Sequence, residues 1–331
     1  MLAYVLRRVA IMIPTLFLIS LVSFIIIQLP PGDYLTTYVA RLAQGGETVQ
    51  PETLAALEQR YALDQPVIVQ YWKWITNIVL HLDFGYSFEY GKSVSSLLAD
   101  RLPLTVTLGV VTMLFTWATA LPFGVYSAVR KYSVGDYIIT GIVFIGLGIP
   151  NFLLALSVAY IQLRFFGHSV GGLFSPEFQD AAWNLGKLLD LLGHVWLPIV
   201  IIAWGNIAGV VRIMRANLLD ELHKPYVVTA RSRGLNERDV IVKYPVRVAL
   251  NPFVSTIGWV LPSLIAGEII VAKVLGLETT GPMLLKALQG QDMYLAGSVI
   301  FVLSVLTVVG TLLSDLLLGV VDPRIRETAT A

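Results

Sequence analysis

The chain has 331 residues, of which 56% are hydrophobic and only 14% are charged, whereas an average soluble domain carries roughly 25% charged residues. The charges cluster between long apolar runs, which excludes a soluble protein and indicates that lipid surrounds those runs. A net charge of +1 gives no electrostatic case for a nucleic-acid partner. The absence of cysteine excludes disulfides and cysteine-based metal or redox sites.

Six apolar stretches are long enough to cross a hydrocarbon core, which takes about 20 residues of helix. The first follows Arg7 and Arg8 and exceeds the apolar region of a signal peptide, with no small-residue cleavage site after it, so we expect it to be retained. The expected spans are 9–29, 104–129, 137–166, 195–214, 253–275 and 295–321. The sequence therefore predicts an all-α membrane protein with six transmembrane helices and both termini on one side.

The distribution of basic residues predicts the orientation. Lysine and arginine concentrate in the terminal segments, in the pair Arg130 and Lys131, and in residues 215–250. Positive residues accumulate in short cytoplasmic segments of membrane proteins. We therefore expect both termini in the cytoplasm.

Residues 30–103 form a large external loop in this topology. Two stretches predict amphipathic helices, PETLAALEQRYAL at 51–63 and PVIVQYWKWITNIVLHL at 66–82. Their aromatics Tyr71, Trp72 and Trp74 suit either anchoring at the membrane interface or stacking on a sugar. The loop is either a cap over the helices or a contact for the substrate, and the sequence leaves both readings open.

One short stretch of this loop resembles a phosphate-binding loop. It runs from Gly85 to Ser93 with five residues between its glycines, where the phosphate-loop motif has four. No nucleotide-binding fold adjoins it, so we expect no ATP hydrolysis by this chain.

Proline and polar residues interrupt several spans. Pro150 precedes Asn151 in the third span, Asn206 lies in the fourth and Glu268 lies in the fifth. A proline frees backbone carbonyls, which in a membrane must be satisfied by neighbouring helices or by water in a cavity. Asn151, Asn206 and Glu268 are therefore candidates for a translocation pathway, while a static kink and an interhelical hydrogen bond are the plain alternatives.

The most informative segment is the inner loop 215–250. Pro225 suits the first turn of a helix, Gly234 suits its end, and Asn236 suits the cap of a second helix with Asp239 three residues later. The pattern predicts a helix-turn-helix that projects from the membrane.

One side of the first short helix is expected to hold Tyr226, Val227, Ala230 and Gly234, with basic residues around it. Small side chains would allow a partner protein to approach closely. A groove on a partner and an anionic lipid surface are both compatible with this segment.

The same segment carries a family resemblance. YVVTARSRGLNERDVIVKYPVRVALNP resembles the cytoplasmic coupling loop of permeases of ATP-binding-cassette (ABC) importers, and specifically the peptide/nickel family. The general pattern is E-A-A-x3-G-x9-I-x-L-P, in which Ala230 and Gly234 match while Val228 and Thr229 replace the first two positions and Tyr244 replaces the Ile. The peptide branch reads T-A-R-A-K-G-L, which residues 229–235 follow closely. Further matches are LRR at the start, LDQPVIVQYW, LDFGYSF, ADRLPLTVTLG, IPNF and the closing DPRIR.

The resemblance implies a permease subunit in a bacterial or archaeal plasma membrane. Its implied partners are a second, similar permease, two ATPase subunits that use ATP and Mg²⁺, and an external substrate-binding protein, whereas this chain binds no cofactor. The implied ATPase-docking residues are Tyr226, Val227, Thr229, Ala230, Arg231, Arg233, Gly234 and Leu235. The solute would be an oligopeptide, with an oligosaccharide as the alternative.

A different class of function is a stand-alone secondary transporter or channel. Such a protein predicts inverted repeats, and the two halves of this sequence show no convincing similarity. The expected organisation is a first helix at residues 1–29, an external loop at 30–103, and a five-helix permease core at 104–331 that contains the coupling loop 215–250.

Overall fold

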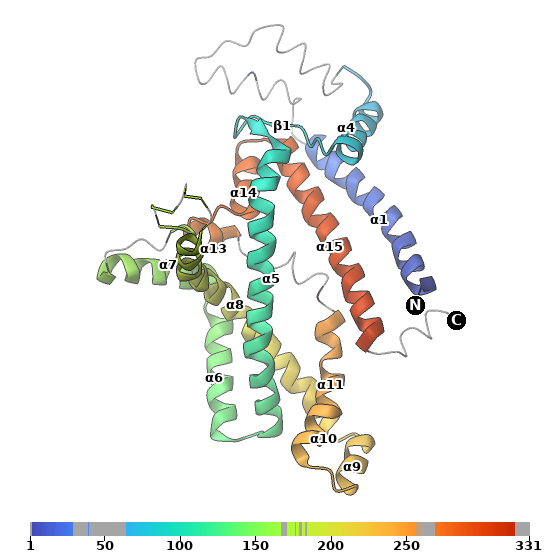
Figure 1. Ribbon diagram of the computed structural model, residues 1–331, viewed down its shortest axis with the longest axis vertical. Coiled ribbons are helices and arrows are strands. Elements are labelled where there is room, and N and C mark those ends of the chain that lie inside the picture. The colour runs from blue at the N-terminus through green and yellow to red at the C-terminus, as the bar shows by residue number, and fades with distance from the viewer. Residues whose placement is uncertain are drawn as a thin grey trace. The chain divides into compact units, whose positions relative to one another are not determined.

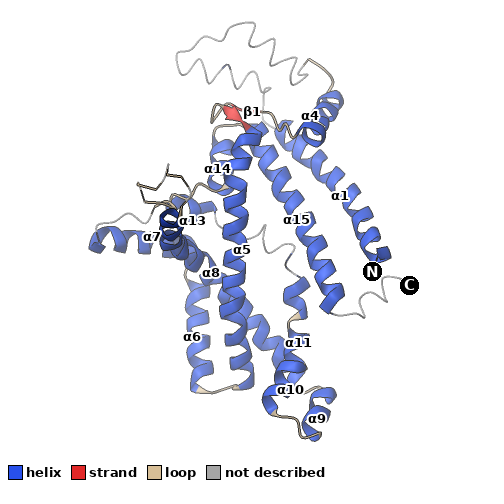
Figure 2. Ribbon diagram, in the orientation of Figure 1, coloured by secondary structure: helices blue, strands red, loops and turns tan. Residues whose placement is uncertain are grey.

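The computed structural model describes residues 2–28, 39, 64–166, 171–175, 177–178, 181–182, 184–255, 257 and 269–321. The regular secondary structure of these residues is helical apart from one short hairpin, and loops and turns connect the elements (Figure 2). The chain divides into two compact units. Unit 1 consists of Val106–Glu278 and Gly310–Ala331, and unit 2 consists of Leu2–Thr105 and Thr279–Val309.

Four described helices are long and apolar enough to cross a membrane: α1 (Leu2–Gln28), α5 (Val94–Val129), α8 (Leu185–Leu222) and α15 (Met293–Val321) (Figure 1). A fifth crossing is possible if the bent pair α6 (Val134–Gly148) and α7 (Asn151–Ile161) counts as one span. The expected span 253–275 lies mostly outside the described residues. The apolar helices establish a multi-pass membrane protein, and six spans stay a prediction.

The third expected span, 137–166, is broken rather than continuous. α6 and α7 are bent by 93° at the break, and a π-helical turn, η1 (Gln162–Phe166), follows α7. Pro150 explains the position, because a proline disfavours the helical conformation of the preceding residue. Ile149 has φ −101° and ψ 115°, which is extended backbone, and Asn151 opens the new helix.

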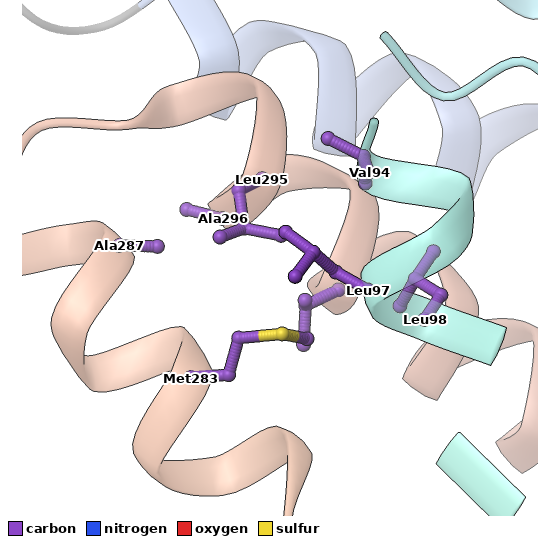
Figure 3. Close-up of a cluster of buried hydrophobic side chains, with 8 residues drawn as sticks. Val94, Leu97, Leu98, Met283, Ala287, Leu295 and Ala296 are labelled. Carbon is purple, nitrogen blue, oxygen red and sulfur yellow. The ribbon is translucent and has the colours of Figure 1, made fainter. Parts of the chain in front are cut away.

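Unit 2 contains α1, α4 (Val67–His81), α14 (Thr280–Gln289) and the adjoining parts of α5 and α15. α1 approaches α15 closely at Gly297, where an added Cβ would lie 2.3 Å from Ile27 Cγ1, so a larger residue there would have to displace the Ile27 side chain. A hydrophobic core joins α5, α14 and α15 (Figure 3). Its buried residues are Val94, Leu97, Leu98, Met283, Ala287, Leu295, Ala296 and Val299.

Helix α4 confirms the helix expected at 66–82 and shows how its aromatics are used. Tyr71 and Trp74 are buried against Phe24 of α1, and the Tyr71 hydroxyl lies 2.7 Å from Ser20 Oγ. Trp72 is 54% exposed. Two of the three aromatics therefore hold α4 on α1 rather than offering a stacking surface, and the other expected helix, 51–63, lies outside the described residues.

The stretch that resembles a phosphate loop is an antiparallel hairpin. β1 (Tyr86–Ser87) pairs with β2 (Lys92–Ser93), with Tyr86 opposite Ser93. A phosphate loop instead connects a strand directly to a helix. This hairpin also encloses Asp292, whose carboxylate accepts hydrogen bonds from Ser87 Oγ at 2.5 Å, Glu89 N at 3.1 Å and Leu295 N at 3.2 Å.

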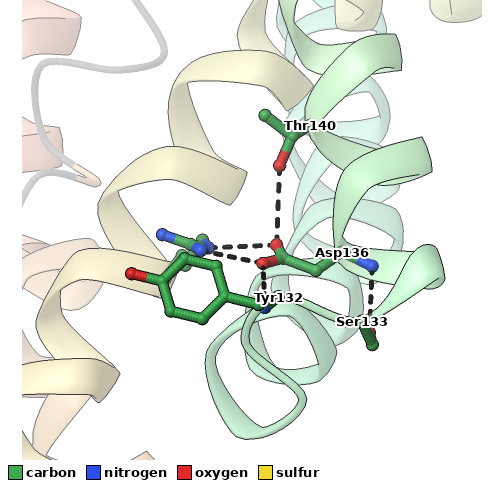
Figure 4. A network of polar contacts seen from close by, with 5 residues as sticks. Tyr132, Ser133, Asp136 and Thr140 are labelled. Carbon is green, nitrogen blue, oxygen red and sulfur yellow. Dashed lines mark hydrogen bonds and ion pairs between the residues drawn. The ribbon is translucent and has the colours of Figure 1, made fainter.

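Unit 1 contains α6, α7, η1, α8, α13 (Ile269–Val274) and the remaining parts of α5 and α15. It also contains three short helices, α9 (Pro225–Ser232), α10 (Glu237–Lys243) and α11 (Pro245–Ala249). α5 lies so close to α8 at Gly124 that an added Cβ would be 2.6 Å from Met214 Cβ. α6 is fixed to α8 by Asp136, which is 2% exposed and accepts hydrogen bonds from Arg215, Thr140 and the backbone of Tyr132 (Figure 4).

Candidate functional site

The expected helix-turn-helix follows directly on α8. It consists of α9 (Pro225–Ser232) and α10 (Glu237–Lys243), and α11 (Pro245–Ala249) comes next. Figure 1 shows α9 and α10 at the end of unit 1, below α11. We call α9, α10 and the turn between them the protrusion.

Local sequence signals define both helices of the protrusion. Pro225 occupies the first turn of α9, where its missing N–H costs nothing. Gly234 has φ +72° with open space around it, a backbone conformation that favours glycine by about 1 kcal/mol. The Asn236 side chain caps α10 by accepting a hydrogen bond from Arg238 N at 3.3 Å. The expected cap is present, and its acceptor binds the backbone of Arg238 rather than that of Asp239.

The interior of the protrusion is a small apolar cluster. Val227 and Val240 are fully buried and Ala230 is 5% exposed, and the three side chains pack together. We expected Val227 and Ala230 on a face offered to a partner. That expectation is wrong for these two side chains, because α10 folds back over them. Their small size instead allows α9 and α10 to approach closely.

A bidentate ion pair links the two helices at the turn. Arg231 Nη2 donates to Glu237 Oε1 at 2.7 Å, and Arg231 Nε lies 3.1 Å and 3.2 Å from the two carboxylate oxygens. The hydrogen bond from Arg231 lowers the pKa of the Glu237 carboxyl. Sequence analysis missed Glu237, although its place six residues after Arg231 across a glycine turn was a usable signal.

Tyr226 fixes the protrusion to α8. Its hydroxyl donates to the Glu221 carboxylate in the last turn of α8. Burial, followed by this hydrogen bond, raises the pKa of the Tyr226 hydroxyl above its usual range. Tyr226 is still 38% exposed, so it serves as an anchor and also contributes to the surface.

The protrusion rests on a core that reaches back along α8. Ile241 of α10, Ala249 of α11 and Phe253 are buried with Met214 and Leu218 of α8. α10 and α11 are therefore packed on α8 through a shared apolar core.

The outer surface of the protrusion combines exposed apolar and basic side chains. Val228 is 52% exposed and Leu235 is 43% exposed, and Thr229, Arg233 and Gly234 are also exposed. Thr229 Oγ1 donates to Pro225 O at 2.9 Å. This surface fits a partner protein that supplies an apolar groove with acidic residues around it.

Two of the three candidate pathway residues lie together in unit 1. The Asn206 side-chain amide donates to Ile202 O at 2.9 Å, and that of Asn151 donates to the same carbonyl at 3.4 Å. Asn151 begins α7 at the 93° break, and Asn206 is exposed in the middle of α8. The third candidate, Glu268, lies outside the described residues.

Comparison with known families accounts for almost the whole chain. A family model described as "Binding-protein-dependent transport system inner membrane component" matches residues 120–327. A second, for the N-terminal part of such components, matches residues 1–109. The chain belongs to this family. It is thus a permease of binding-protein-dependent transport systems, as the resemblance in residues 226–252 indicated.

Individual relatives match the permease from end to end. It is 36% identical to the oligopeptide transport system permease protein AppB of Bacillus subtilis, over 98% of this chain and 99% of that one. It is 30% identical to the oligopeptide permease OppB of Escherichia coli K12, over 98% and 100%. The peptidoglycan transport permease YejB of Agrobacterium fabrum is 29% identical, over 98% of both chains.

A solved structure supports the fold. The permease matches the inward-facing MetNI methionine ABC transporter with a TM-score of 0.52 and 18% identity, over 68% of this chain and 96% of that one. The arrangement of helices is therefore that of an ABC transporter permease.

Proposed function

We propose that this permease carries an oligopeptide-type solute into the cytoplasm as the membrane subunit of an ATP-driven importer. An external binding protein delivers the solute, and a second, similar permease completes the pathway. Two separate ATPase subunits hydrolyse ATP with Mg²⁺ and drive alternating access. The observation that carries this proposal is the family match over residues 1–109 and 120–327 together with the ordered protrusion.

The proposed ATPase dock is the outer surface of the protrusion. Val228 and Leu235 supply exposed apolar contacts, and Arg233 and Thr229 supply polar ones. Val227 and Ala230 support this surface from inside. The ion pair Arg231–Glu237 keeps α9 and α10 in a fixed relation, so that the two helices move as one body when a partner pulls on either.

The proposed topology has six spans with both termini in the cytoplasm. The protrusion then faces the ATPases, and residues 30–103 face the binding protein. The amides of Asn151 and Asn206 meet at Ile202 O, which supports a polar pathway beside the break between α6 and α7. Glu268 belongs to the same proposal on sequence grounds alone.

The choice of an oligopeptide rests on the relatives. AppB and OppB are named for oligopeptide transport, whereas YejB is named for peptidoglycan transport. An oligosaccharide is the alternative solute. A stand-alone transporter or channel has no support from this family match.

Mild-detergent purification from the native membrane, with every accompanying polypeptide identified by mass, tests the assembly. We expect a second permease and ATPase subunits to accompany the chain. The accompanying binding protein, loaded in turn with peptides and with oligosaccharides, should stimulate ATP hydrolysis with peptides. Recovery of the chain alone from a preparation shown to be intact would contradict the proposal. Stimulation of ATP hydrolysis by oligosaccharides only would mean that the solute is an oligosaccharide and not a peptide.

A further inference from the structure

An open groove of about 630 Å³ crosses unit 1 beside α10. One wall is the last part of α5, with Leu121, Pro122 and Val125. The opposite wall comes from α10 and the segment after it, with Val242 and Val246 among its side chains. Val242 is 56% exposed. A groove with this lining is unfavourable in water, so an apolar ligand is expected to cover it.

Two arginines line the same groove. They are Arg130, which follows α5, and Arg238 on α10. The Arg130 guanidinium lies 5.7 Å from the centroid of the Tyr126 ring, which also lines the groove. Among the described residues no carboxylate pairs with either arginine. The groove therefore combines apolar walls with two positive charges that have no negative partner in the described part of the chain.

The acidic residues of α10 do not neutralise Arg238. Glu237 binds Arg231 at 2.7 Å, and Asp239 lies 3.6 Å from Lys243. Each of these acids already faces another cation. An anion that enters the groove would therefore meet two guanidinium groups that no described carboxylate neutralises, and such groups suit a phosphate because they can donate paired hydrogen bonds.

The groove lies where a membrane-crossing helix ends. α5 is a membrane-crossing candidate that ends at Val129, and Arg130 begins the turn into α6. Figure 1 shows this turn and α10 at the same end of unit 1. Leu121, Pro122 and Val125 thus belong to the membrane-crossing candidate itself, and Arg130 follows its last residue, where lipid phosphates are expected.

We propose that this groove binds an anionic phospholipid. Its phosphate lies between Arg130 and Arg238, and an acyl chain follows Val125, Pro122 and Leu121. Basic pockets at the ends of transmembrane helices favour anionic headgroups over zwitterionic ones. The charge of the groove separates this ligand from a neutral lipid, and the exposed dock residues Val228, Thr229, Arg233 and Leu235 do not line the groove.

Native mass spectrometry of the purified complex tests the headgroup preference. The complex is stripped of lipid and titrated with phosphatidylglycerol or phosphatidylcholine. The double variant Arg130→Gln with Arg238→Gln should bind phosphatidylglycerol roughly 30-fold more weakly. Each basic group near a membrane surface strengthens the binding of an anionic lipid roughly fivefold, and the variant loses two of them. The matched control, Arg212→Gln with Arg247→Gln, removes two exposed arginines that do not line the groove and should bind as the parent does. Equal affinity of the two double variants would overturn the proposal.

A thiol in the groove identifies the occupant. The chain has no cysteine, so Val242→Cys introduces the chain's single thiol at an exposed groove position. Added phosphatidylglycerol should slow maleimide labelling of that thiol in the stripped complex, and phosphatidylcholine should slow it much less. Protection that persists without any lipid would mean that a protein segment fills the groove, and equal protection by both lipids would mean that the arginines select nothing. Either result would overturn the proposal.

Discussion

Arg215 of α8 donates two hydrogen bonds to Asp136 at the start of α6, with Nη2 2.9 Å from Oδ2 and Nε 3.1 Å from Oδ1 (Figure 4). The Asp136 side chain is only 3% exposed. This pair lies on the stretch of α8 that leads into the protrusion. The Arg215–Asp136 ion pair therefore fixes α6, which is followed by the 93° bend into α7, to α8, from which the protrusion extends.

Loss of the arginine should destabilise unit 1 strongly. Arg215→Met leaves a buried carboxylate without its cation, and removal of one member of a buried pair costs about 3 kcal/mol. Arg212→Met is the matched control on an exposed position one turn earlier and should change the stability little. Detergent-titrated unfolding, followed by circular dichroism, measures both. Equal unfolding midpoints for the two variants would show that the pair does not hold the helices together.

The protrusion offers a test that separates its surface from its interior. Val228→Arg changes an exposed residue and should abolish co-purification of the ATPase while the permease keeps its unfolding midpoint. Ala230→Arg forces a charge among Val227 and Val240, so it should lower that midpoint as well. Val134→Arg, at a 77% exposed valine on α6, is the control. An ATPase that stays bound to the Val228 variant would place the dock elsewhere.

The two amides at Ile202 O give a test of the pathway. Asn206→Leu should reduce solute uptake roughly tenfold, which is the effect of losing one polar contact in a rate-limiting step, and the assembled complex should persist. Asn217→Leu makes the same change farther along α8 and should leave uptake unchanged. Uptake in proteoliposomes measures both variants. If the Asn206 variant transports at the parental rate, the amide is only an internal hydrogen bond.

Unit 2 should become less stable as the pH rises. Burial raises the pKa of the Asp292 carboxyl above its ordinary value of 3.8, because the loss of hydration outweighs the hydrogen bonds from Ser87, Glu89 and Leu295. The folded state then binds this proton more tightly than the unfolded state does. Its contribution to stability is fully present below pH 3.8 and is lost as the pH rises through the raised value.

Asp292→Asn should flatten this pH dependence, since the amide cannot ionise. Unfolding midpoints measured over a pH series upward from 3.8 test the slope. Asp64→Asn, at an exposed position of the same unit, controls for the loss of one negative charge. If Asp292→Asn keeps the parental dependence of the unfolding midpoint on pH, then the Asp292 carboxyl is not the group that causes this dependence.

Local signals predicted the protrusion well. Pro225, Gly234 and Asn236 each act within one turn of helix, so the sequence alone places the start of α9, its end and the cap of α10. The burial of Val227 and Ala230 depends on Val240 folding back over them. Helical spacing predicts which residues share a face, but not which partner covers that face.

The third span shows the same limit. Pro150 predicted an interruption, but a bend of 93° depends on how α6 and α7 pack on α8, which no short pattern records. The burial of Tyr71 and Trp74 on α1 is likewise a tertiary contact. The six spans, the cytoplasmic termini, the docking residues and Glu268 stay predictions.

Site-specific crosslinking from the protrusion tests the central claim most directly. Leu235→Cys introduces the chain's single thiol on the exposed surface, and a short thiol-to-amine crosslinker applied to the purified complex should join this chain to an ATPase subunit identified by mass. Leu189→Cys, 60% exposed and about 50 Å away along α8 at 1.5 Å per residue, should give no such product. An ATPase adduct from Leu235→Cys alone would support the protrusion as the ATPase dock. Adducts from both positions or from neither, in a complex that contains the ATPase, would contradict it.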